Sequence, residues 1–179
     1  MKMRLVISGL IVAFAFSACN QPAKTNDTET ADSTSVGTPP TADLKDENTQ
    51  KVYNSYLKLK DVLVASNFSG AREAGNELAA ALSAIKGCEN TSALATKIST
   101  SEDLKTQRTH FTALSSDIID LMKHTDVNSG ALYVQFCPMA NEGEGGYWLA
   151  AEKEVRNPYY GDEMLNCGEV KETIGVGKN

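Results

Sequence analysis

The chain of 179 residues is poor in groups that enzymes use for catalysis, and it has only two histidines. It lacks a Ser, His and Asp motif, a glycine-rich phosphate loop, and a pair of histidines around a glutamate. The net charge of −6 disfavours nucleic acid as a partner. No second long apolar run follows the first residues, so no later membrane span is expected. These absences predict a protein that is not an enzyme and does not bind nucleic acid.

The first nineteen residues have the features of an export signal. Two basic residues precede an apolar run from Leu5 to Phe16, which is shorter than the about 20 residues of a transmembrane helix. A basic start, a short apolar stretch and small residues are typical of a secretory signal peptide. The residues Phe16-Ser17-Ala18-Cys19 resemble the lipobox of bacterial lipoproteins, which implies removal of residues 1–18 and a lipid on Cys19. The alternative is an ordinary signal peptide that happens to end before a cysteine.

Residues 19–43 are expected to form a disordered tether. They are rich in Thr, Ser, Asp, Asn and Pro, and they cannot bury enough apolar surface to offset the entropy of ordering. Asn20 is not the aspartate that favours inner-membrane retention in many Gram-negative bacteria, and no acidic cluster follows Cys19. We therefore expect a periplasmic protein, lipid-anchored to the outer membrane, with one domain at residues 44–179.

The domain is expected to be mainly α, as a small antiparallel bundle of about four helices with an irregular C-terminal segment that contains short β-strands. Amphipathic stripes at helical spacing must pack on one another. A shorter helix is expected from Ser92 to Ile98, and Ser99 with Glu102 has the spacing of a capping box for the last helix. The stripes comprise Val52, Tyr56, Leu59 and Leu63; Ala71, Ala74, Leu78, Leu82 and Ile85; and Leu104, Phe111, Leu114, Ile118 and Leu121.

The pattern changes after Gly130. Residues 131–136 have the β-branched and aromatic content of a strand, and residues 147–149 form a second strand candidate. The sequence Asn-Pro-Tyr-Tyr-Gly at residues 157–161 predicts a turn. Residues 170–177 are interpreted as a polar, poorly patterned tail.

Two short segments carry the candidate chemistry. In Cys137-Pro138-Met139 the proline favours an extended chain, in which residues two apart point to the same side. In Met164-Leu165-Asn166-Cys167 residues three apart meet on one face of a helical turn. The two segments could surround one ion with two thiolates and two thioethers, a soft ligand set that favours Cu(I) over zinc.

Other interpretations of these residues stay open. An oxidising compartment allows a disulfide between Cys137 and Cys167, which spacing alone favours, and methionine commonly fills cores. The arrangement of the two sulfur atoms distinguishes a disulfide from a metal site. His110 is a fifth candidate ligand, but His124 lies about 21 Å farther along the helix and cannot share the ion. Cys88 is left as a free thiol or as the partner of another cysteine.

The chain resembles the DUF3347 family over about Lys45 to Ile174. The segments that carry the resemblance are Gln107–Phe111, Leu114-Ser115, Tyr133–Ala140, Trp148-Leu149, Asn157–Gly161 and Met164–Val170. Members of this family occur as single lipoproteins and as domains fused to periplasmic adaptors of heavy-metal efflux pumps. The resemblance therefore implies the handling of copper or a related metal.

With this resemblance, metal binding becomes the leading hypothesis. We expect capture or delivery of Cu(I) by Cys137, Met139, Met164 and Cys167, with His110 as a further ligand. The expected partners are the metal ion and a heavy-metal efflux adaptor or another periplasmic protein. The alternative is a non-metal protein-interaction module in which a Cys137–Cys167 disulfide stabilises the C-terminal segment.

Overall fold

The computed structural model describes residues 42–176, which lie in one compact unit. The predicted signal peptide, the lipidation site at Cys19 and most of the predicted tether lie outside the described residues. No helix within residues 42–176 is long and apolar enough to cross a membrane. The described helices are α1 (Glu47–Val64), α2 (Phe68–Leu82), α3 (Glu89–Thr100) and α4 (Leu104–Lys123), with 3-10 turns η1 (Asn141–Gly143) and η2 (Gly161–Glu163). The strands are β1 (Asp43–Leu44), β2 (Val127–Ser129), β3 (Ala131–Cys137), β4 (Gly146–Ala150) and β5 (Glu169–Gly175).

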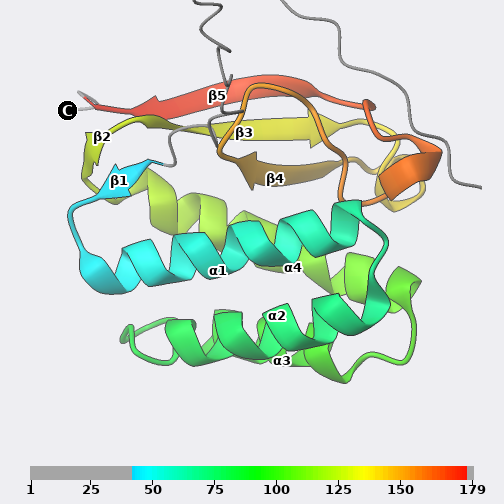
Figure 1. Cartoon of the computed structure of the whole chain (residues 1–179), viewed down its shortest axis with the longest axis horizontal. Helices are drawn as coiled ribbons and strands as arrows, with labels where there is room; N and C mark the ends of the chain where they lie inside the picture. The colour runs from blue at the N-terminus through cyan, green and yellow to red at the C-terminus, as the bar shows by residue number, and fades with distance from the viewer. Residues whose placement is uncertain (1–41, 177–179) are drawn as a thin grey trace, which may run out of the picture. The chain divides into compact units, whose positions relative to one another are not determined.

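The elements form three layers (Figure 1). A three-stranded antiparallel sheet of order β4-β3-β5 covers α1 and α4, and α2 and α3 lie on the far side of these two helices. Each helix packs against the next one along the chain, as the amphipathic stripes require. The mainly α fold with strands in the C-terminal part is therefore confirmed.

Three helices begin at a residue whose side chain accepts a hydrogen bond from a backbone N–H group of the first turn. Such N-caps satisfy one of the amide groups that have no partner within the helix. The bonds are Thr49 N–H to Asp46 (2.8 Å), Gly70 N–H to Asn67 (2.9 Å) and Thr106 N–H to Asp103 (2.7 Å).

Two local predictions are wrong. The capping box of Ser99 and Glu102 does not form, because α3 continues to Thr100 and Asp103 caps α4 instead. Residues 170–177 are not an unpatterned tail, because residues 169–175 form β5, which pairs with β3. Backbone hydrogen bonds to a neighbouring strand outweigh the weak apolar alternation of this segment.

Aromatic side chains connect the layers in the core. The ring of Tyr56 in α1 stacks on Phe111 in α4, with 5.5 Å between the ring centroids. Tyr159 contacts Phe111 at 5.7 Å and Trp148 of β4 at 6.0 Å. Each of these rings is buried, and aromatic pairs in such geometries contribute about 0.5–1.5 kcal/mol beyond their buried area.

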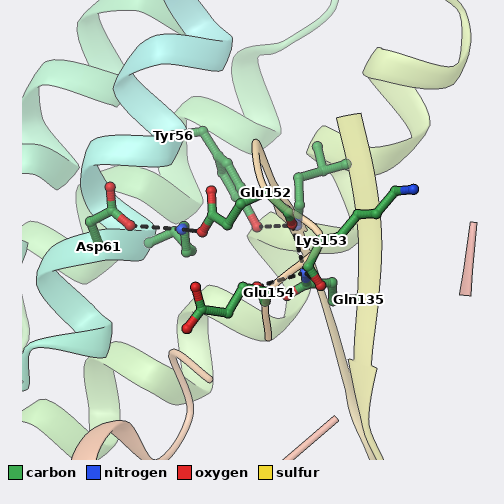
Figure 2. A network of polar contacts seen from close by, with 8 residues as sticks. Tyr56, Asp61, Gln135, Glu152, Lys153 and Glu154 are labelled. Carbon is green, nitrogen blue, oxygen red and sulfur yellow. Dashed lines mark hydrogen bonds and ion pairs between the residues drawn. The ribbon is translucent and has the colours of Figure 1, made fainter. Parts of the chain in front are cut away.

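A buried lysine also connects α1 to the end of β4. Lys60 is only 1% exposed, and its Nζ lies 2.7 Å from Asp61 Oδ1 and 2.9 Å from Glu152 Oε1. Nearby, the Tyr56 hydroxyl accepts a hydrogen bond from the backbone N–H of Leu149 at 3.1 Å (Figure 2). A buried charge is tolerated only with such partners, so this network fixes the sheet on the helices.

Candidate functional site

The two cysteines proposed as metal ligands form a disulfide in the structure. Cys137 is the last residue of β3, and Cys167 lies two residues before β5. Their Cα atoms are 5.6 Å apart, within the usual range for a disulfide. Cys137 is fully buried, whereas Cys167 is partly exposed. The bond ties the segment between β4 and β5, here called the cap loop (residues 151–168), to the end of the central strand.

Asn157 holds the cap loop in its conformation. This fully buried side chain donates a hydrogen bond to Cys167 O at 3.0 Å and accepts one from Tyr159 N–H at 2.8 Å. Its backbone N–H donates to Leu165 O at 2.8 Å, and its carbonyl accepts from Gly161 N–H at 3.0 Å. The Asn-Pro-Tyr-Tyr-Gly sequence thus serves to fold the cap loop, because buried polar groups must find partners.

Gly168 allows the chain to pass from Cys167 directly into β5 of the sheet. Gly168 has φ +144°, and a Cβ atom there would lie 2.8 Å from Trp148 Cη2 and 2.9 Å from Phe136 O. Only glycine accepts this conformation and this close approach without strain. The chain therefore passes directly over the buried Trp148 on its way from Cys167 into β5.

The other three proposed ligands differ in exposure and in the element that carries them. Met139 is 54% exposed, and its backbone carbonyl accepts a hydrogen bond from the Tyr160 hydroxyl at 2.6 Å. Met164 is partly buried at the end of η2. His110 lies on α4 in a separate surface depression near Ser101, without a cysteine or methionine among the lining residues.

Two further observations concern the metal hypothesis. Within residues 42–176, no three side chains of His, Cys, Asp or Glu are grouped so as to hold a metal ion. Cys88 is the one free cysteine of this part of the chain, and burial raises the pKa of its thiol. The structure brings Cys137 and Cys167 together, and it leaves His110 and Cys88 apart from them.

A cavity of about 530 Å³ lies between α4, η1 and the cap loop, a volume in the range typical of small-molecule sites. Charged side chains of both signs and two tyrosines surround it. The lining residues are Lys105, Arg108 and Thr109 of α4, Asn141 and Glu142 of η1, and Tyr159, Tyr160 and Glu163 of the cap loop. This cavity was not predicted from the sequence.

Arg108 is the residue that joins the walls of this cavity. Its Nε donates to Pro158 O at 2.9 Å, and its Nη2 donates to Leu63 O at 3.1 Å and to the Ser66 hydroxyl at 3.0 Å. Burial lowers the pKa of the guanidinium, and the nearby carboxylate of Glu163 opposes that change. The side chain therefore holds the cap loop against the C-terminal end of α1.

The backbone around the cavity is strained. In the described part of the chain, the non-glycine residues with left-handed φ are Ser66 (52°), Asn141 (53°) and Glu142 (60°). Ser66 accepts a hydrogen bond from Arg108, and the other two residues line the cavity. Residues held in such sparsely populated conformations concentrate at functional sites.

The comparison with protein families finds a match to residues 52–130, by the model described as "Protein of unknown function (DUF3347)". The matched region contains most of α1, all of α2 to α4, and both Arg108 and His110. It ends before Cys137, so the disulfide and the cap loop lie outside the match. No curated protein and no solved structure matches the chain.

Proposed function

The chain belongs to the DUF3347 family, and from this premise we propose that it is a non-catalytic binding protein whose binding surface is the cavity between α4 and the cap loop. The observation that carries the proposal is the disulfide between Cys137 and Cys167. Because this bond engages both thiols of the hypothetical metal site, the oxidised protein has a rigid cap loop in place of two thiolate ligands. A rigid loop that carries part of a binding surface lowers the entropy lost on binding.

We place this binding protein outside the cytoplasm. The disulfide agrees with an oxidising compartment, and the lipobox-like residues that end at Cys19 predict a lipid anchor. The proposed location is the periplasm, at the outer membrane. A partner protein of this compartment, such as a heavy-metal efflux adaptor, remains a prediction from the family resemblance.

The second candidate function is the carriage of Cu(I) by the reduced protein. The observation that favours it is the position of the two cysteines, 30 residues apart in the sequence and 5.6 Å apart at their Cα atoms. A dithiol reductant would transfer two electrons and two protons to the disulfide and would itself become a disulfide. Cu(I) would then displace protons from Cys137 and Cys167, with Met139, Met164 and His110 as the predicted additional ligands.

One experiment distinguishes the two candidates. The full chain with Cys19→Ser is purified from the periplasm without reductant, the linked cysteines are mapped by peptide mass spectrometry, and Cu(I) is titrated against a competing chelator before and after reduction. The binding-protein proposal expects a peptide that links Cys137 to Cys167 and no tight Cu(I) binding in either state.

The second candidate, a Cu(I) carrier, expects the reduced chain to bind one Cu(I) tightly. The double variant Cys137→Ser with Met164→Leu should then lose this binding. The variants His110→Gln and His124→Gln form a matched pair on the same helix. A loss of affinity in the first variant only would assign His110 as a ligand.

A further inference from the structure

We propose that the cavity between α4 and the cap loop binds a small zwitterion that carries one carboxylate and one ammonium group, of the α-amino acid class. This inference rests on the proposed binding function and names its ligand. Its basis is a pair of opposite charges, Arg108 and Glu163, which line the same cavity without forming an ion pair.

The first step concerns the cation. Arg108 is partly buried, and the three hydrogen bonds described above go to neutral oxygen atoms, two carbonyls and a hydroxyl. These bonds fix the plane of the guanidinium and leave Nη1 without a hydrogen bond within residues 42–176. A guanidinium held in this way is prepared to accept the carboxylate of a ligand through its remaining N–H groups.

The second step concerns the carboxylate. Glu163 is exposed at the end of η2, and within the described residues no cation lies within 4 Å of it. Its charge nevertheless acts on Arg108 through space, so the two groups are near each other but not in contact. A ligand with a carboxylate and an ammonium group would bridge this gap and neutralise both charges. A dianion such as phosphate fits less well, because Glu163 lines the same cavity as Arg108 and repels a second negative charge.

The third step concerns the other walls. The charges of Lys105 and Glu142 already face each other at 3.8 Å on the exposed rim, so they do not compete for the ligand. Tyr160, which is partly exposed, supplies ring surface for an apolar or aromatic ligand body. The side-chain amide of Asn141 accepts a hydrogen bond from the Thr112 hydroxyl at 2.9 Å and donates one to Gly145 O at 2.8 Å. These bonds hold this wall of the cavity in place before any ligand binds.

The test uses the full chain with Cys19→Ser and three probes, which are L-phenylalanine, its N-acetyl derivative and its amide. Isothermal titration and amide chemical shifts measure the binding of each probe. We expect the free amino acid to bind at one site. Each blocked probe should bind with an affinity at least about tenfold lower than that of the free amino acid, because each lacks one charge-assisted hydrogen bond. Glu163→Gln should lower the affinity for the free amino acid to that of the N-acetyl derivative. Glu73→Gln, an exposed carboxylate on α2, should change nothing.

The proposal is overturned if no probe binds at about 1 mM, or if Glu163→Gln leaves the preference for the free amino acid unchanged. Peptide mapping of Cys137 and Cys167 in the same sample separates the failures. A mapped disulfide without probe binding refutes only the ligand class. Free thiols with tight Cu(I) binding refute the proposed binding function itself.

Discussion

Removal of the Cys137–Cys167 disulfide should destabilise the domain by a predictable amount. The bond closes a segment with a sequence separation of 30 residues. Loop-closure entropy for that length gives a stabilisation of about 3.6 kcal/mol at 25 °C through restriction of the unfolded chain. With an unfolding entropy of about 2.1 cal/mol/K per residue, this free energy corresponds to a decrease of about 13 °C in melting temperature for the 135 residues described.

The assay is thermal unfolding followed by circular dichroism, in the background Cys19→Ser. The double variant Cys137→Ser with Cys167→Ser should melt about 13 °C below the parent, and dithiothreitol should lower the parent to the same value without affecting the double variant. Cys88→Ser is the matched control, since Cys88 forms no disulfide. A double variant that melts within about 2 °C of the parent would refute the reasoning.

Three further predictions concern stability. Lys60→Met should cost about 3 kcal/mol in chemical denaturation, because it leaves the partly buried Glu152 without its cation. Adding Glu152→Gln should recover most of the loss, and no recovery would contradict a charge effect. A backbone hydrogen bond from the first turn of α4 lowers the pKa of Asp103 below its usual value, so its contribution to stability is complete above the unfolded pKa of about 3.9 and is lost as pH falls through the folded pKa. The stability difference from Asp103→Asn, measured by urea unfolding, should therefore change below about pH 4 and stay constant at higher pH. Gly168→Ala should lower the free energy of unfolding by about 2 kcal/mol through backbone strain and steric overlap. The control Gly87→Ala, where a Cβ meets nothing within 4 Å, should cost about 1 kcal/mol through backbone strain alone. Equal decreases in melting temperature for the two variants would argue against the overlap at Gly168.

The apolar stripes were sufficient to predict the helices and much of the core. Val52, Tyr56 and Leu63 are each fully buried as their spacing indicates. The β5 strand could not be predicted in this way, because its exposed residues carry little apolar alternation. Its pairing depends on β3, which lies more than 30 residues earlier.

Two cations, Lys60 and Arg108, occupy positions in the sequence where an apolar residue is expected. Lys60 lies four residues after Tyr56, and Arg108 lies three residues before Phe111, so both occupy positions on an apolar stripe. A charged residue at such a position requires a polar partner from another element. Glu152 is that partner for Lys60, and backbone carbonyls serve Arg108.

Local features of this protein follow from its sequence alone, because periodicity and capping depend on residues within a few positions of one another. It therefore indicated the helices, β3, β4 and the turn at residues 157–161. The bond between Cys137 and Cys167, in contrast, depends on the packing of distant segments. The same holds for the cavity around Arg108, whose walls come from α4, η1 and the cap loop. Such contacts depend on how the layers pack, and no local pattern records which distant side chains will meet.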